Sequence, residues 1–173
     1  MRPVLSPARQ SGSMVAPTWN ENVKETTMAK LEFAFKRGDI LSGEIFAEQI
    51  PETWKALKSF LPATLTILNA RWSGREVHAQ CLVPDRPPRE NQTIYAGLGD
   101  IIYAREWPEV RDYTGFEAIA MFYGAETVRD WRGTFAVNHI GRLDPSQWEL
   151  VQEIGNRIYR HGGEDCTIRV LED

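Results

Sequence analysis

Hydrophobic and polar residues begin to alternate regularly near position 30. In residues 30–46, KLEFAFKRGDILSGEIF, the alternation runs on both sides of Gly38, with Leu31, Phe33 and Phe35 on one face. A period of two is typical of β-strands, and a glycine adopts the positive φ that a tight hairpin turn requires. This segment is therefore predicted to form a β-hairpin.

Two segments have the spacing and boundary residues of helices. The first begins near Pro51 and ends before Pro62, with hydrophobic residues at helical spacing between them. In the second, Asp144 can cap the helix, Pro145 suits its first turn and the pair at 162–163, both glycine, ends it. Two amphipathic helices are predicted, the second close to the C-terminal end.

Six further segments have strand patterns separated by turn residues. They are residues 64–72, 75–83, 94–104, 116–124, 134–143 and 166–172. With the first hairpin they give about eight strands and two helices, and too few crossover helices for a parallel sheet. The predicted fold is mainly β, a closed eight-stranded antiparallel barrel with two capping helices.

Composition indicates one folded domain preceded by a tail. The 173-residue chain is 42% hydrophobic and 25% charged, as folded domains are. Residues 1–29 lack a periodic hydrophobic pattern and are predicted to be a flexible tail, and residues 30–173 the barrel domain. The net charge of −4, with no basic stripe, argues against a nucleic-acid partner.

The sequence has no pattern that predicts a cofactor. Cys81 and Cys166 lie far apart, outside disulfide or zinc spacings, and are expected to be buried free thiols. No Walker loop, dinucleotide fingerprint or calcium loop occurs. No cofactor, no metal and no membrane partner are therefore expected, and the expected location is the cytoplasm.

Three strand segments carry a resemblance to a known group of proteins. GDIIY at 99–103, IAMFYG at 119–124 and VNHIGRL at 137–143, followed by a helix and a strand, resemble the cyclophilin-like fold family of small, largely uncharacterised bacterial and archaeal proteins. The resemblance implies an eight-stranded barrel with two helices. It does not imply proline isomerisation, because the FHR and QGGD stretches of true cyclophilins are missing.

The predicted function is small-molecule binding at the mouth of the barrel, with hydrolysis and isomerisation as candidate activities. An aromatic wall with one cation would suit a small planar or anionic ligand. The expected ligand-binding residues are Trp72, Tyr103, Arg105, Tyr123 and Asn138. No catalytic residue is assigned, and the alternative is that these aromatic residues simply fill a core.

Other polar residues leave alternatives open. His78 is expected to be an exposed or hydrogen-bonded strand histidine, and Glu106 to face away from Arg105. Asp100 is either a general base with a raised pKa or a hydrogen-bonded turn residue.

The competing hypothesis is a non-enzymatic interaction module that forms a homo-oligomer. Aromatic residues of charged loops would then form the interface, namely Trp107, Tyr113 and Trp131. A homo-oligomer is expected under either hypothesis. Peptidyl-prolyl isomerisation is the third and least favoured function.

Overall fold

The computed structural model describes residues 29–109 and 111–171. The predicted tail therefore lies outside the described residues, apart from Ala29. The elements are β1 (Lys30–Phe35), β2 (Ile40–Ile45), α1 (Pro51–Phe60), β3 (Ala63–Asn69), β4 (Glu76–Gln80), β5 (Gln92–Thr93), β6 (Tyr95–Ala96), β7 (Asp100–Arg105), β8 (Glu117–Phe122), β9 (Glu126–Thr127), β10 (Arg129–Asp130), β11 (Gly133–Thr134), β12 (Val137–Leu143), a 3-10 turn (Pro145–Gln147), α2 (Trp148–His161) and β13 (Glu164–Leu171).

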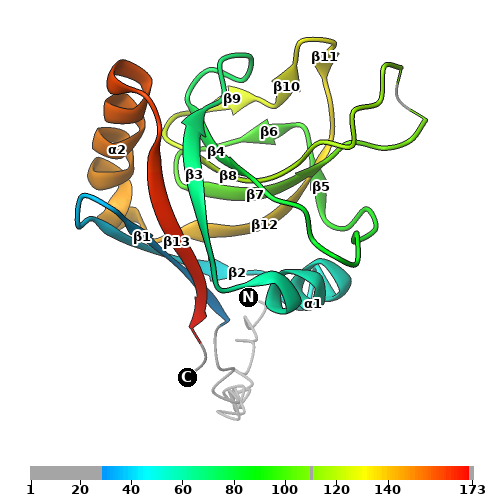
Figure 1. Cartoon of the computed structure of the whole chain (residues 1–173), viewed down its shortest axis with the longest axis horizontal. Helices are drawn as coiled ribbons and strands as arrows, with labels where there is room; N and C mark the ends of the chain where they lie inside the picture. The colour runs from blue at the N-terminus through cyan, green and yellow to red at the C-terminus, as the bar shows by residue number, and fades with distance from the viewer. Residues whose placement is uncertain (1–28, 110, 172–173) are drawn as a thin grey trace, which may run out of the picture.

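Eight of the strands close into an antiparallel barrel (Figure 1). Their order is β2-β1-β13-β3-β4-β8-β7-β12, and β12 pairs with β2 to complete the ring. Gly141 makes this closure possible, because a Cβ there would lie 2.2 Å from the carbonyl oxygen of Glu44 on β2. The predicted fold, a mainly β chain with a closed eight-stranded barrel and two helices, is confirmed.

The first hairpin forms as the alternation predicts. β1 pairs with β2 so that Phe33 faces Leu41, and the turn between them contains Gly38 with φ of 102°. Leu31, Phe33 and Leu41 are all buried. The alternating pattern therefore directs one face of this hairpin into the core.

The barrel wall separates two hydrophobic clusters. Ile101 and Tyr103 of β7 point into the main core, which also contains the buried faces of α1 and α2. Ile102 and Ala104 point the other way, into a second cluster with Ala118, Ala120 and Phe122 of β8. The short strands β6, β9, β10 and β11 lie on one side of the barrel, at the top of Figure 1. The outer face of β7 and β8 is thus covered as well as the inner face.

The C-terminal helix begins slightly later than predicted. Asp144 caps the 3-10 turn, through a 2.9 Å hydrogen bond from the Ser146 amide, and α2 follows from Trp148 to His161. The buried face of α2 consists of Val151, Ile154, Gly155 and Ile158. Within the described ranges, neither helix has the length and hydrophobicity needed to cross a membrane.

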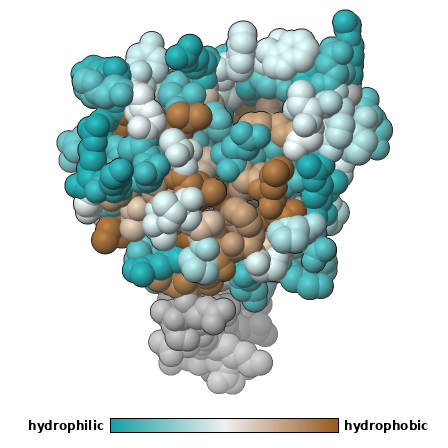
Figure 2. All heavy atoms as spheres, viewed as in Figure 1, coloured by the Kyte–Doolittle hydropathy of each residue, from teal (hydrophilic) through white to brown (hydrophobic). Residues whose placement is uncertain are grey.

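The surface is mixed in character. In the orientation of Figure 2, hydrophobic side chains reach the surface in the middle and lower part of the face, and hydrophilic side chains surround them. Cys81 and Cys166 are buried free thiols, as the sequence predicts.

Candidate functional site

A pocket of about 740 Å³ lies against the outer face of the barrel wall. Its floor includes Glu76 and His78 of β4 and Ala104 of β7. In the sheet register, Glu76 faces Phe122 and His78 faces Ala120, and both partners belong to the outer cluster. The pocket therefore lies outside the barrel, whereas the sequence analysis expects the site at the barrel mouth.

Aromatic side chains form much of the wall. They are Trp72 from the turn after β3, Trp107 and Phe116 from the segments that flank the loop between β7 and β8, and Trp131 and Phe135 from the β10–β11 region. Trp131 is 54% exposed and Trp72 is 65% exposed, so both rings remain accessible to a ligand. Three of the six tryptophans of the chain thus converge on one pocket.

The pocket carries an excess of positive charge, although the chain as a whole is acidic. Five arginines line it against three acidic residues, Glu76, Glu106 and Asp130. The arginines are Arg71, Arg89, Arg105, Arg129 and Arg132. Among the described residues, only Arg132 of these five forms ion pairs. The other four form no ion pair there, although Arg129 lies close enough to Glu126 to lower the pKa of that carboxylate.

Two of these arginines stack on the same aromatic ring, that of Trp107. The guanidinium carbon of Arg89 lies 4.2 Å from the centroid of the Trp107 ring, and that of Arg105 lies 4.5 Å from it. Arg105 also donates a 2.6 Å hydrogen bond to the carbonyl of Pro87. The stacking and the hydrogen bond hold the Arg105 guanidinium in one place at the pocket wall.

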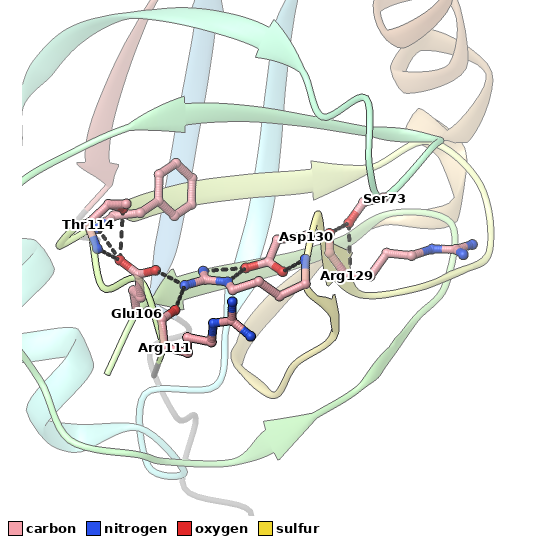
Figure 3. Close-up of polar contacts among 8 residues, drawn as sticks. Ser73, Glu106, Arg111, Thr114, Arg129 and Asp130 are labelled. Atoms are coloured by element: carbon pink, nitrogen blue, oxygen red, sulfur yellow. Dashed lines mark hydrogen bonds and ion pairs between the residues drawn. The ribbon is translucent and has the colours of Figure 1, made fainter. Parts of the chain in front are cut away.

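A network of ionic contacts fixes the rim of the pocket (Figure 3). Glu106 accepts hydrogen bonds from the amide and hydroxyl of Thr114 and forms an ion pair with Arg132. Arg132 also pairs with Asp130. Burial alone would raise the pKa of Glu106, but these bonds and one from the Phe116 amide lower it to about 2. The network ties the loop after β7 to the β10–β11 hairpin.

The two polar residues of the floor have fewer partners: a hydrogen bond with Ser73 lowers the pKa of Glu76, but by less than burial raises it. Glu76 is only 6% exposed, and its Oε2 atom has no hydrogen-bond partner among the described residues. Burial raises the pKa of Glu76 to about 7. His78 is half-buried, its ring lies edge-on to Phe116 at 5.9 Å, and its Nδ1 atom also lacks a partner in the described structure. Burial lowers the pKa of His78.

The five residues expected to bind a ligand separate into three places. Trp72 and Arg105 both line the pocket. Tyr103 lies inside the barrel, where its hydroxyl donates a 2.8 Å hydrogen bond to Glu117. Asn138 lies nearby on the paired strand and donates to the Thr53 hydroxyl of α1 and to the Pro88 carbonyl. The 81–91 segment and α1 occupy this end of the barrel. The polar groups of Tyr103 and Asn138 therefore already form hydrogen bonds within the protein.

Tyr123 lies beneath α2. Its ring packs so closely on Gly155 that a Cβ at that glycine would lie 2.2 Å from the tyrosine ring. Its hydroxyl accepts a 2.9 Å hydrogen bond from Asn69. Tyr123 therefore supports the packing of α2 and is not part of the pocket lining.

Asp100 has the environment of a hydrogen-bonded turn residue. It accepts hydrogen bonds from the Gly97 amide and from Arg142, and His139 Nε2 lies 3.3 Å away. Burial alone would raise the pKa of Asp100, but these contacts lower it to about 2. The alternative of a general base with a raised pKa is wrong.

The sequence analysis missed Glu76 as a site residue and treated His78 as an ordinary strand histidine. A usable signal was present, because the two lie two residues apart on one strand and therefore share a face. What the pattern could not provide is the pairing of this strand with β8, whose outer face carries the small residues Ala118 and Ala120. Within residues 29–109 and 111–171, no group of three or more His, Cys, Asp or Glu side chains is arranged to hold a metal ion.

Comparison with known proteins identifies the family and the fold. The model of the family described as "Protein of unknown function (DUF3830)" matches residues 35–170. The structure of McbB in complex with tryptophan is similar, with a TM-score of 0.59 and 15% identity over 80% of this chain. The match covers 44% of the McbB chain, so this chain spans less than half of that protein.

A second solved structure is similar over nearly its whole length. The hypothetical protein AF2241 from Archaeoglobus fulgidus has a TM-score of 0.53 and 22% identity, with 85% of this chain and 98% of AF2241 covered. No curated protein matches the chain. At these identities the two structures inform on fold alone, and they agree with the closed barrel described above. With most of its length matched by the family model, the chain belongs to the DUF3830 family of proteins of unknown function and has a cyclophilin-like fold.

Proposed function

We propose that the outer pocket binds a small anionic molecule that carries an aromatic ring, such as an aromatic carboxylate. The observation that supports this most strongly is the pair of guanidinium groups over Trp107, since neither Arg89 nor Arg105 has an ion-pair partner among the described residues. Arginine N–H groups bind carboxylates strongly, and the one hydrogen bond that Arg105 donates within the described residues, to the Pro87 carbonyl, uses only its Nη1 atom. Trp72 and Arg105 are the two residues that this proposal shares with the sequence analysis.

The rest of the lining favours the same class of ligand. The accessible rings of Trp72 and Trp131 offer faces on which an aromatic ring can stack. The excess of arginine in a partly enclosed site attracts an anion even though the chain carries a net charge of −4. A pocket of about 740 Å³ lies within the range of small-molecule sites.

The McbB structure suggests one ligand to include. That protein was determined in complex with tryptophan, which has an aromatic ring and a carboxylate. The likeness to this chain concerns the fold, so tryptophan enters here as a test compound and not as an assigned ligand.

Calorimetric titration with three matched compounds tests the proposal. Benzoate carries both features, benzamide lacks the charge, and cyclohexanecarboxylate lacks the aromatic ring. We expect benzoate to bind more tightly than either analogue, and Arg105→Ala to weaken benzoate binding by about 10- to 100-fold, as loss of a charged hydrogen bond does. Arg160→Ala, at an exposed position of α2, is the matched control. Equal binding of benzoate and benzamide would contradict the proposal.

The homo-oligomeric hypothesis stays a prediction, as does the cytoplasmic location. Trp131 is 54% exposed and Tyr113 is 40% exposed, which supports a surface contact, although Trp107 and Trp131 also line the pocket. Light scattering at micromolar concentration tests the oligomer. A monomer would remove this hypothesis and would leave the binding proposal unaffected.

A further inference from the structure

The floor of the pocket holds an acid and a base side by side on β4. Glu76 and His78 are separated by one residue, so their side chains leave the same face of the strand at a spacing of roughly 7 Å. Both residues line the pocket. A ligand held by the arginines of the wall would therefore lie over two titratable groups.

The contacts of these two groups explain their burial only in part, since a hydrogen bond with Ser73 does not offset the effect of burial on the pKa of Glu76. Most buried polar atoms in proteins have a hydrogen-bond partner, and an unpartnered one requires a specific reason. Here Glu76 Oε2 and His78 Nδ1 both lack a partner among the described residues, within the same pocket. A ligand that supplies those partners is the simplest reason for keeping both residues.

The hydroxyl of Ser73, which also lines the pocket, already forms hydrogen bonds with the backbone of another segment. Ser73 donates a 2.9 Å hydrogen bond to the carbonyl of Arg129 and accepts one from the amide of that residue. Ser73 is therefore a link between the turn after β3 and the β10 strand and is poorly placed to act as a nucleophile. Proton transfer fits the free groups of this floor better than covalent catalysis does.

We infer that Glu76 transfers a proton at the carbon next to the ketone of a bound aromatic 2-oxo acid, and that His78 donates a hydrogen bond to the ketone oxygen. This inference rests on the proposed function, because the arginines of the wall would hold the carboxylate of that substrate. Its further claim is that the protein is an enzyme and that Glu76 is a catalytic residue.

The proposed step balances without any co-reactant. The Glu76 carboxylate takes a proton from the carbon, and the C–H electron pair forms a carbon–carbon double bond while the ketone π electrons move to oxygen. His78 is neutral and donates a hydrogen bond to that enolate oxygen. Return of a proton from Glu76 to carbon regenerates the ketone; alternatively, a proton from water goes to oxygen to give the enol, and the proton held by Glu76 passes to the hydroxide so formed. No atom is oxidised or reduced.

The environment suits this chemistry. A general base works best when its pKa lies near the working pH, and burial raises the pKa of Glu76 to about 7. A neutral histidine is a suitable donor to an enolate, and burial lowers the pKa of His78.

Exchange of the benzylic protons of phenylpyruvate in deuterium oxide, followed by proton NMR, tests the inference. We expect the protein to accelerate exchange, Glu76→Gln to reduce the acceleration by 100-fold or more, and His78→Phe to reduce it by on the order of 100-fold. Glu153→Gln, at an exposed position of α2, is the matched control and should retain the acceleration.

Calorimetry with phenylpyruvate separates this inference from the proposed function. Binding by Glu76→Gln with loss of exchange supports both. Binding by the natural protein without any acceleration would overturn the proton-transfer inference and leave the proposed function standing. No binding of phenylpyruvate at millimolar concentration would overturn the proton-transfer inference, and only the absence of benzoate binding as well would overturn the proposed function. A thermal melt of each variant shows whether it folds. If His78→Phe does not fold, the isosteric Glu76→Gln variant still tests the inference.

Discussion

The guanidinium of Arg105 lies 4.5 Å from the centroid of the Trp107 ring, two residues further along the chain. The strand β7 ends at Arg105, and the chain bends through Trp107 and Pro108, which brings the cation and the ring together at the pocket wall. Glu106, between them in sequence, instead pairs with Arg132. Glu106 thus stabilises the rim of the pocket, whereas Arg105 and Trp107 on either side of it line the pocket.

Trp107→Leu should separate the two features of the proposed ligand. The variant loses an aromatic surface worth about 0.5–1.5 kcal/mol, or roughly two- to tenfold in affinity. Because Arg89 and Arg105 remain, the preference for benzoate over benzamide should persist, while the preference for benzoate over cyclohexanecarboxylate should decrease without disappearing, since Trp72 and Trp131 still offer aromatic faces. Calorimetric titration of the three compounds measures both preferences. An unchanged aromatic preference would show that Trp107 does not contact the ring.

Glu76→Gln should make the protein more stable above neutral pH. The pKa of Glu76 is raised from 4.5 to about 7, so between these values the folded state holds a proton that the unfolded chain has released. The free energy of unfolding therefore decreases as pH rises through this window, by up to about 3 kcal/mol at about 1.4 kcal/mol per pKa unit. The glutamine side chain does not titrate, so the free energy of unfolding of the variant does not decrease in this way as pH rises.

Urea unfolding of the two proteins at pH 5 and pH 8 measures the effect. The curves should lie closest at pH 5, and the variant should be the more stable protein at pH 8. A gain in stability together with a loss of exchange activity is the signature of a residue kept for function. A destabilised variant at pH 8 would mean that the Glu76 carboxylate has a structural partner.

Glu106→Gln should loosen the rim of the pocket. Breaking a buried ion pair typically costs 3–5 kcal/mol, but Arg132 keeps Asp130, so we expect a loss of about 2–3 kcal/mol. The pKa of Glu106 is lowered to about 2, so its contribution is fully present above pH 4.5 and is lost as pH falls from there toward 2. Chemical unfolding between pH 3 and pH 7 checks this, and a difference between the two proteins that does not shrink on acidification would contradict it.

Tyr103→Phe should weaken the fold without affecting the ligand. The phenol donates a hydrogen bond to the fully buried Glu117 carboxylate, and leaving a buried acceptor with one partner fewer costs about 1–3 kcal/mol. Since Tyr103 points into the barrel and the pocket lies outside it, benzoate affinity should match that of the natural protein. A loss of affinity greater than threefold in the folded variant would place Tyr103 in the binding machinery.

The barrel could be predicted because its strands and helices carry local signals. The alternation before and after Gly38 defines the first hairpin, and the Asp144-Pro145 pair marks the start of the last helical region. The outer layer could not be predicted in the same way. Strands β5, β6, β9, β10 and β11 have two residues each, which is too short for any periodicity to appear.

The arrangement of the expected site residues also depends on contacts between segments far apart in the sequence. Trp72 and Arg105 line one pocket together with residues of the 129–136 segment, and no local sequence pattern predicts that arrangement. Alternation correctly puts Tyr103 on the face opposite Ala104, but the partner of its hydroxyl, Glu117, depends on how β7 pairs with β8. A residue's face can be predicted from a strand pattern, whereas its hydrogen-bond partner on another strand cannot.

Tryptophan indole N–H signals in a two-dimensional NMR spectrum report directly whether a ligand binds in the outer pocket. Trp72, Trp107 and Trp131 line the pocket, whereas Trp54 and Trp148 do not, and single Trp→Phe variants assign the signals. Titration with benzoate should shift the first three signals in a saturable way and leave the other two in place. Shifts confined to Trp54 or Trp148, or no shift at millimolar benzoate, would contradict binding of an aromatic anion in the outer pocket.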